Sequence, residues 1–280
     1  MKQSVNIFIL NWNAKDLARD CIKSLNKITY PNANIILIDN GSTDNSVEEI
    51  KNEFPKIEII SIGKNLGYAA GNNYGFVNTK KESDFTIFIN NDTVVSPDFV
   101  EPLINGFDNN GLVKQTSPKI LYDDNPNTLW FAGGKINLYF GWIRHSGIRK
   151  IDEGQFNTVS KIDYATGCCF CIRTKDFKQL KMFNESYPMY GEDVDLSLRI
   201  RKIGGNIMYI PESKIWHKVS ASIGGEYSFN KWKRKNYSKM KLMMNYLNPI
   251  IVPFALVLNI FSGLIELKIW MIRKLMGKFK

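Results

Sequence analysis

Residues 84–95 read DFTIFINNDTVV, an apolar run that passes directly into two amides and an acid. Residues 85–89 favour a strand, and Asn90, Asn91 and Asp92 follow at once. A turn would explain one or two such residues, because Asn and Asp bond to their own backbone. A turn does not explain why apolar residues return at positions 94–95. We therefore predict a buried strand whose carboxyl end presents side-chain oxygens.

Three other short apolar runs have the same character, at residues 5–10, 35–38 and 57–62, and helices are predicted between the runs, at 14–25, 44–54 and 67–77. Strands that alternate with helices predict a parallel α/β sheet with right-handed crossovers. Ligands of such sheets bind at the carboxyl ends of the strands. Asn11, Asp39, residues 63–65 and residues 90–92 all fall at those ends, so we expect them to converge.

The second half of the chain has a more mixed pattern. Further strands are predicted at residues 114–122, 129–136 and 161–173, a helix at 190–203, and two short strands at 206–210 and 213–217 on either side of Pro211. Gly204 and Gly205 are expected to end the helix.

The cysteines argue against a zinc site. Cys168, Cys169 and Cys171 form C-C-x-C, and no second cluster completes a tetrahedral set. We predict small apolar residues on a buried strand. The first residues show no secretory leader, so we expect a reducing, cytoplasmic compartment.

The formal net charge of +10 belongs to the C-terminal part, because residues 1–230 hold 26 basic and 26 acidic side chains. Residues 242–265 carry no charge, but proline and asparagine interrupt them and basic clusters flank both sides. We predict helices that lie in an anionic membrane surface. The alternative is a helical pair packed on the preceding domain or on a second subunit. Trp232, Tyr237 and Tyr246 among the basic residues support nucleic-acid binding as a rival function. Because residues 1–230 are neutral and the basic residues bracket an apolar run, we expect a membrane partner and no nucleic acid.

Three groups could carry chemistry. Asp92 at a strand end suits Mg²⁺ or Mn²⁺, which take oxygen ligands and share their shell with phosphates. Glu192 and Asp193 begin a predicted helix, where acids complement the helix dipole or one serves as a general base. His217 is either structural or a metal ligand. His145, in a basic loop without acidic neighbours, is expected at the surface or on the acceptor side.

Seven segments, taken in order, resemble successive motifs of family 2 glycosyltransferases with the GT-A fold: ILNWNAKDLARDCIKSL, IDNGSTDNS, NLGYAAGNNYG, INNDTV, YATGCCFCIR, YGEDVDLSLR and IPESKIWHKVSAS. The sequences of these motifs are most similar to those of the rhamnosyltransferase-like branch. The resemblance implies a Rossmann-like, mostly parallel α/β sheet flanked by helices over residues 1–228. Residues 229–280 would then form a C-terminal helical, membrane-associating extension.

The same resemblance assigns site residues. The nucleotide sugar would contact Asn11, Asp39, Asn65, Gly67 and Asn91; Asp92 and His217 would hold the divalent metal; and Asp193 would be the catalytic base. Asn90 departs from the family pattern, because many relatives have an acid there.

The implied reaction is a single inverting displacement. The donor would be a UDP- or dTDP-linked sugar, with dTDP-rhamnose among the candidates, and the acceptor a hydroxyl of a lipid-linked glycan or polysaccharide. Such an enzyme would work in the cytoplasm, at the inner face of the cell membrane, with a homo-oligomer left open. The alternative is a peripheral membrane or nucleic-acid-binding protein whose sugar-nucleotide domain is inactive.

Overall fold

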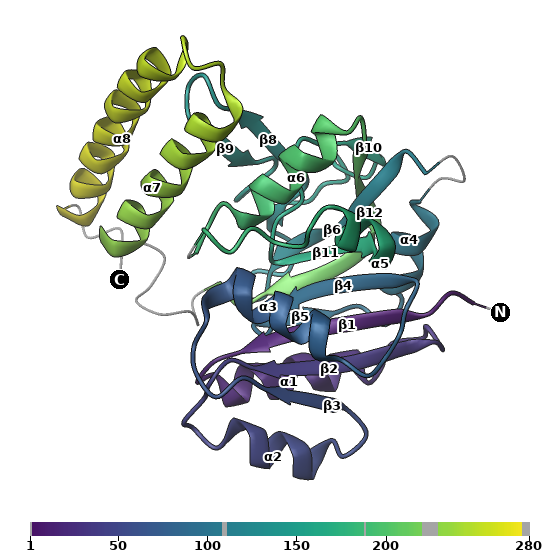
Figure 1. The fold of residues 1–280 in the computed structure, drawn as a ribbon. Coiled ribbons are helices and arrows are strands. Elements are labelled where there is room, and N and C mark those ends of the chain that lie inside the picture. The colour runs from purple at the N-terminus through teal and green to yellow at the C-terminus, as the bar shows by residue number, and fades with distance from the viewer. Residues whose placement is uncertain (1, 108–110, 188, 220–228, 276–280) are drawn as a thin grey trace.

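The computed structural model describes residues 2–107, 111–187, 189–219 and 229–275. Among these residues the largest sheet is a mixed α/β sheet with the strand order β10-β12-β6-β11-β4-β1-β2-β3, with β5 added to β12 and β7 added to β6. Helix α3 and helix α6 cover the face of the sheet toward the viewer in Figure 1, and α1 lies behind it. The predicted fold class is confirmed.

The N-terminal half matches the pattern expected from the sequence. Its parallel strands are β1 (Val5–Asn11), β2 (Ala33–Asp39), β3 (Glu58–Ser61) and β4 (Phe85–Asn90). Its helices are α1 (Lys15–Leu25), α2 (Ser46–Glu53) and α3 (Gly67–Asn78). In the register of these strands Asn11 lies opposite Asp39, and Asn90 lies opposite the residue before Asn11. The polar residues at the strand ends therefore share one edge of the sheet.

The second half continues the sheet with strands of both directions. Its elements are β5 (Thr93–Val95), α4 (Val100–Asn105), β6 (Val113–Tyr122), β7 (Leu129–Phe131), β8 (Gly134–Asn137), β9 (Trp142–His145), β10 (Ser160–Lys161), β11 (Cys169–Arg173), α5 (Thr174–Gln179), α6 (Glu192–Lys202) and β12 (Asn206–His217). Strand β11 is antiparallel to both β4 and β6, and β12 is parallel to β6. Strand β12 therefore runs in the direction of β4, and His217 at its end lies at the same edge.

Three strand predictions were wrong in detail. The predicted strand at 129–136 is divided at Gly133, whose φ of +105° breaks the extended conformation. The predicted strand at 161–173 is divided too, because β10 ends at Lys161 and β11 begins at Cys169. Pro211 does not interrupt β12. Proline has no N–H to donate to the neighbouring strand, and it lies at a register irregularity between Ile210 and Lys214, where β12 does not follow the regular pairing with β6.

The core lies on both faces of β4. The ring of Phe88 on this strand lies 4.9 Å from Phe177, 5.1 Å from Phe183 and 5.4 Å from Phe170, measured between ring centroids. All four cysteines are buried and free, as expected for small apolar residues. Burying each of the phenylalanine side chains contributes about 1.5–3 kcal/mol to the stability of the fold.

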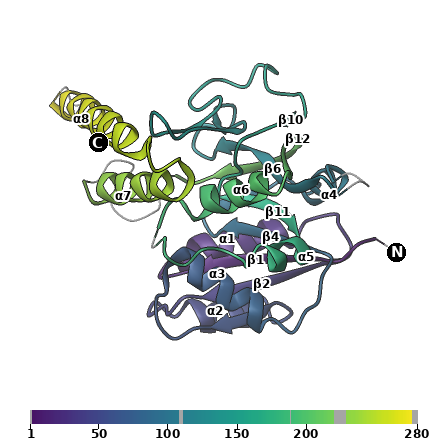
Figure 2. The ribbon, with the colours of Figure 1, turned by 45° about the horizontal axis from the view of Figure 1, so that its top comes forward.

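Two C-terminal helices, α7 (Phe229–Tyr246) and α8 (Val252–Leu275), stand beside the sheet domain (Figures 1 and 2). The uncharged stretch 242–265 is divided between them, and a turn separates the two helices. Leu242 of α7 is fully buried against Tyr164, Tyr187 and Val194, so α7 packs on the sheet domain. Within the described ranges, neither of these helices nor any other is long and apolar enough to cross a membrane.

Candidate active site

The ends of β1, β2 and β4 carry a row of connected polar side chains. Asn11 is fully buried, and its Oδ1 accepts a hydrogen bond of 2.8 Å from Asn91 Nδ2. Its Nδ2 donates to Ser42 Oγ at 3.3 Å, and the backbone N–H of Ser42 donates to the carboxylate of Asp39 at 3.3 Å. Three residues predicted to contact the nucleotide are therefore connected, with Asn91 bonded directly to Asn11 and Asn11 linked to Asp39 through Ser42.

The loop before α3 is held by a residue that sequence reasoning missed. Asn40 Nδ2 donates to Asn65 Oδ1 at 3.1 Å and to the carbonyl of Gly67 at 3.2 Å, and its Oδ1 accepts from Leu66 N at 2.9 Å. Gly67 has a φ of +81°, which favours glycine. The sequence offered one signal for Asn40, its place directly after Asp39. The predicted residues Asn65 and Gly67 are thus tied to the end of β2.

Asp92 and His217 meet at this edge, although 125 positions separate them in the sequence. Strand pairing sets His217 opposite Thr93, and His217 Nε2 lies 3.1 Å from Asp92 Oδ1. Both side chains are buried, with exposed fractions of 4% for Asp92 and 6% for His217. His217 Nδ1 has no hydrogen-bond partner among the described residues.

This pair fits a divalent metal. Two neighbouring ligands of an octahedral ion, each about 2.1 Å from it, lie about 3.0 Å apart, close to the observed separation of the two atoms. One carboxylate oxygen and one imidazole nitrogen are ligand types that Mn²⁺ accepts. Among the described residues no cluster of three or more His, Cys, Asp and Glu side chains could hold an ion alone. Asp92 and His217 would therefore hold an ion only together with other ligands.

The indole of Trp130 separates His217 from His145. Its ring centroid lies 4.5 Å from each imidazole, in edge-to-face geometry. His145 is therefore half-buried rather than freely exposed, and burial lowers its pKa to about 4. No local sequence signal connects these three residues, because they belong to three different strands, β7, β9 and β12.

Asp193 lies in the first turn of α6 and faces the start of β11. Its Oδ2 accepts a hydrogen bond of 2.8 Å from the N–H of Gly167, and the carbonyl of the next residue, Cys168, accepts one of 2.9 Å from Asn90 N. Burial raises the pKa of Asp193, and burial together with the charge of Asp193 raises the pKa of Glu192 to about 8. One short backbone segment therefore connects Asp193 to the strand end that carries Asp92.

Comparison with known proteins supports a common family. The sequence profile described as "Glycosyl transferase family 2" matches residues 6–181. The chain is 24% identical over 221 residues to an N-acetylglucosaminyl-diphospho-decaprenol L-rhamnosyltransferase of Mycobacterium tuberculosis, covering 72% of both chains. It is 23% identical over 211 residues to the low-salt glycan biosynthesis hexosyltransferase Agl10 of Haloferax volcanii, covering 74% of this chain and 64% of that protein.

Solved structures share the fold. GalNAc-T7 with UDP, GalNAc and Mn²⁺ superposes with a TM-score of 0.62 at 17% identity, over 77% of this chain and 44% of that one. Residues 1–349 of Staphylococcus aureus TarS superpose with a TM-score of 0.57 at 13% identity, over 92% of this chain and 70% of that one. These likenesses confirm the GT-A fold expected from the motifs. With its profile match and its rhamnosyltransferase relative, the chain belongs to glycosyl transferase family 2, in the rhamnosyltransferase-like branch.

Proposed function

We propose that this glycosyltransferase moves a sugar from a UDP- or dTDP-linked donor, with dTDP-rhamnose among the candidates, to a hydroxyl of a lipid-linked glycan or polysaccharide. The reaction is a single displacement that inverts the anomeric centre. The observation that carries the proposal is the meeting of Asp39, the Asp92–His217 pair and Asp193 at one edge of the sheet.

The donor end of the site binds the nucleotide and its diphosphate. Asp39 and Asn11 are buried acceptors and donors next to the loop that holds Asn65 and Gly67. Asp92 and His217 would hold Mg²⁺ or Mn²⁺, with the diphosphate completing the shell. The bound metal would stabilise the negative charge that develops on the departing diphosphate.

The acceptor end of the site removes a proton. Because Glu192 is buried and its pKa is raised to about 8, it keeps its proton at neutral pH, and the single negative charge of the pair resides on Asp193. The N–H groups of Gly167 and Val194, each 2.8 Å from an oxygen of Asp193, stabilise this charge. Burial makes Asp193 a stronger base than an exposed aspartate. Asp193 would accept the hydroxyl proton as the acceptor oxygen attacks.

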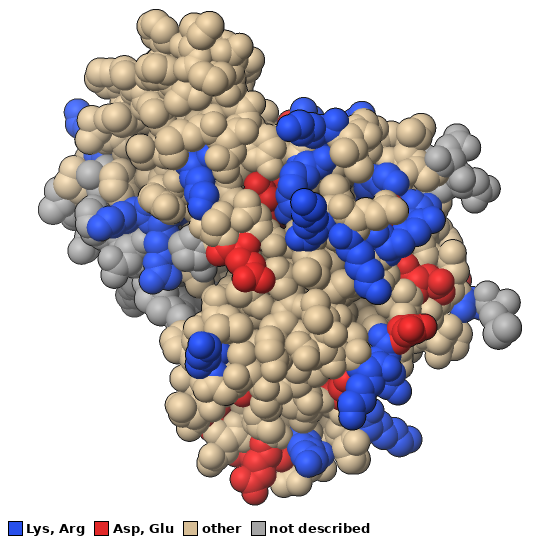
Figure 3. Space-filling view, in the orientation of Figure 1, with Lys and Arg blue, Asp and Glu red and all other residues tan. Residues whose placement is uncertain are grey.

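We also propose that α8 lies on an anionic membrane. Its buried positions toward α7 hold small or polar residues, Ala255, Asn259 and Gly263, whereas bulky residues such as Phe254 (72% exposed) and Phe261 (61% exposed) point outward. This arrangement reverses that of a soluble helix and is typical of helices in contact with lipid. The region of α8 in Figure 3 is almost free of charged side chains.

Basic residues near this apolar face favour anionic lipid over a second protein copy. Exposed cations on the two C-terminal helices include Lys233, Arg234 and Lys268. Each cation near an anionic leaflet contributes about 1 kcal/mol to membrane binding. The free cysteines agree with a reducing compartment, so we place the attachment at the cytoplasmic face.

A panel of UDP- and dTDP-sugars with Mn²⁺ tests the catalytic proposal. The correct donor should raise the melting temperature, since a ligand at 100 times its Kd stabilises the folded state by about 2.7 kcal/mol. It should also be hydrolysed slowly, and the hydrolysis should stop on chelation of the metal. A chain that neither binds nor hydrolyses any member of the panel would contradict the proposal and favour an inactive sugar-nucleotide domain.

Cosedimentation with vesicles of phosphatidylglycerol and phosphatidylcholine tests the membrane proposal. Replacing Phe254 and Phe261 by serine should weaken binding at least about tenfold, because each buried CH₂ contributes about 0.8 kcal/mol. Val77→Ser, at a 65% exposed position on α3, is the matched control. A stable dimer without vesicle binding would assign the face to a second copy, and retention on DNA without vesicle binding would favour the nucleic-acid alternative.

A further inference from the structure

One face of α7 contacts the segment that precedes the proposed base, Asp193. Lys241 Nζ donates to the carbonyl of Ser186 at 2.7 Å and lies 4.9 Å from the ring centroid of Tyr187. Three and six residues earlier on the helix, Ser238 and Lys235 face the same segment. Ser238 Oγ donates to the carbonyl of Met189 at 3.4 Å, and Lys235 lies 5.2 Å from the ring centroid of Tyr190. These positions recur every three or four residues, as expected for one helix face.

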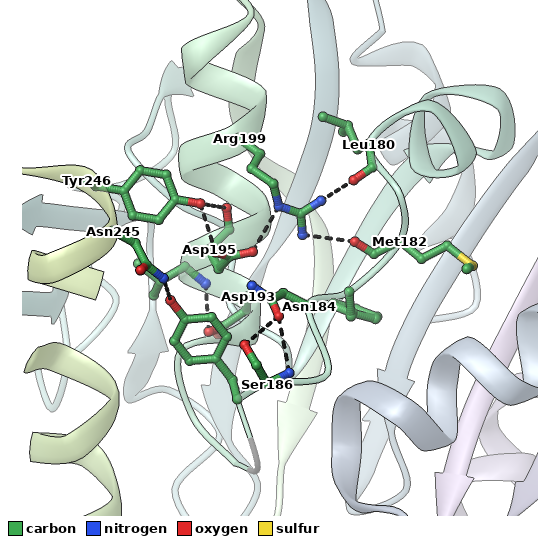
Figure 4. A network of polar contacts seen from close by, with 12 residues as sticks. Leu180, Met182, Asn184, Ser186, Asp193, Asp195, Arg199, Asn245 and Tyr246 are labelled. Atoms are coloured by element: carbon green, nitrogen blue, oxygen red, sulfur yellow. Dashed lines mark hydrogen bonds and ion pairs between the residues drawn. The ribbon is translucent and has the colours of Figure 1, made fainter. Parts of the chain in front are cut away.

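The same face of α7 also contacts α6, the helix that carries the proposed base Asp193. Tyr246 Oη donates a hydrogen bond of 2.7 Å to Asp195 Oδ1, and Asp195 Oδ2 accepts one of 2.8 Å from Arg199 Nε (Figure 4). Asp195 is only 2% exposed, so its charge depends on donors such as these, and Tyr187 also hydrogen-bonds to it. Arg199 also donates to the carbonyls of Leu180 and Met182. Asp195 thus joins α7, α6 and the preceding loop.

The first turn of α6 needs such support. Its N-cap residue, Gly191, has a φ of +97° and provides no side-chain cap, and Tyr190 before it has a φ of +68°. Asp193 Oδ1 itself accepts from the N–H of Val194 in this turn, so the position of the carboxylate depends on the position of the turn. Asp193 lies in this turn, two residues before Asp195. A displacement of the turn would move the carboxylate away from the N–H of Gly167.

We infer that α7 is part of the catalytic apparatus, with Tyr246 as a positioning residue that holds the first turn of α6, and with it Asp193, against Gly167. This inference rests on the proposed role of Asp193. The C-terminal helices then have two separate tasks, since the outward face of α8 contacts the membrane and α7 fixes the base. Tyr246 is not a catalytic residue, because it acts only through Asp195 and the backbone of α6.

The test separates positioning from anchoring by using a short, water-soluble acceptor and the full chain without vesicles. Tyr246→Phe removes one hydroxyl and should lower kcat by about 10- to 100-fold, since small misplacements of a catalytic group have effects of this size. The KM for the donor and the Mn²⁺ requirement should not change. Tyr237→Phe, on the same helix at a 55% exposed position, should have wild-type kinetics.

A second variant and a melting curve guard against unfolding. Lys241→Met keeps the aliphatic stem but removes the donor to Ser186, and it should give the same split between kcat and KM. If Tyr246→Phe melts below the assay temperature, Lys241→Met decides the question. Wild-type kcat in both variants, or a loss that vesicles restore, would overturn the inference. A wild-type enzyme that transfers to no acceptor would instead refute the proposed function.

Discussion

Replacing Asp193 by asparagine separates catalysis from stability. The two oxygens of Asp193 accept from the N–H groups of Gly167 and Val194, and an amide can serve only one of them with its oxygen. The other N–H then loses its acceptor, at a cost of about 1–3 kcal/mol. Removing a charge that burial disfavours offsets part of this cost. We therefore expect the free energy of unfolding to fall by no more than about 2 kcal/mol.

A change of this size leaves a protein of ordinary stability about 99% folded or better, because such proteins start from roughly 5–15 kcal/mol. Loss of a general base, by contrast, lowers the rate by about 10²–10⁴-fold. Transfer should therefore collapse while the donor KM and donor-induced thermal stabilisation persist. Asp16→Asn, at a carboxylate with 80% side-chain exposure, is the control for loss of a charge. Transfer by Asp193→Asn within threefold of the wild-type rate would refute the assignment of the base.

Three further predictions concern the metal, the buried acid and the packing of α3. His217→Gln should raise the Mn²⁺ concentration for half-maximal activity at least about tenfold, and Asn90→Asp should lower it by adding a carboxylate; a metal titration measures both. The free energy of unfolding should fall by a few kcal/mol as the pH rises from 5 to 8.5. The reason is that Glu192 has a pKa of about 8 in the folded chain, so the unfolded chain loses this proton at a lower pH than the folded chain does. Denaturant titrations at several pH values should show a smaller fall for Glu192→Gln. Gly75→Ala should lower the free energy of unfolding by about 1–3 kcal/mol, because the Cβ of the new alanine would clash with Ile38 Cδ1. Adding Ile38→Ala in the same chain should recover part of that loss, as measured by thermal denaturation.

The position of the site followed from local patterns. Each apolar run of the N-terminal half is short and flanked by helical segments, so the parallel topology, and with it the common edge of Asn11, Asp39 and Asp92, could be predicted. Asp193 and His217 were reached only through resemblance to family motifs. Their residue types alone favoured a helix-dipole role and a structural histidine.

The residues at which helices begin were harder to predict. The residue before α2 is Asn45, with a φ of +60° and no side-chain cap bond, although residues 42 and 43 are also of types that cap helices. A proline at position 97 favours a helix start, but α4 begins at Val100. Several conformations of such turns have similar energies, and tertiary contacts select among them.

The sequence by itself therefore determined the alternation of strands and helices, the polar residues at the strand ends, and a C-terminal segment too apolar and too basic to be an ordinary linker. Only the tertiary structure decided that Gly167 meets Asp193, that Trp130 lies between two histidines, and that Tyr246 reaches Asp195. Hydrophobic periodicity depends on neighbours along the chain, so it can be seen in the sequence. Contacts between distant segments depend on strand order and register, such as the insertion of β11 between β4 and β6, and no local pattern specifies them.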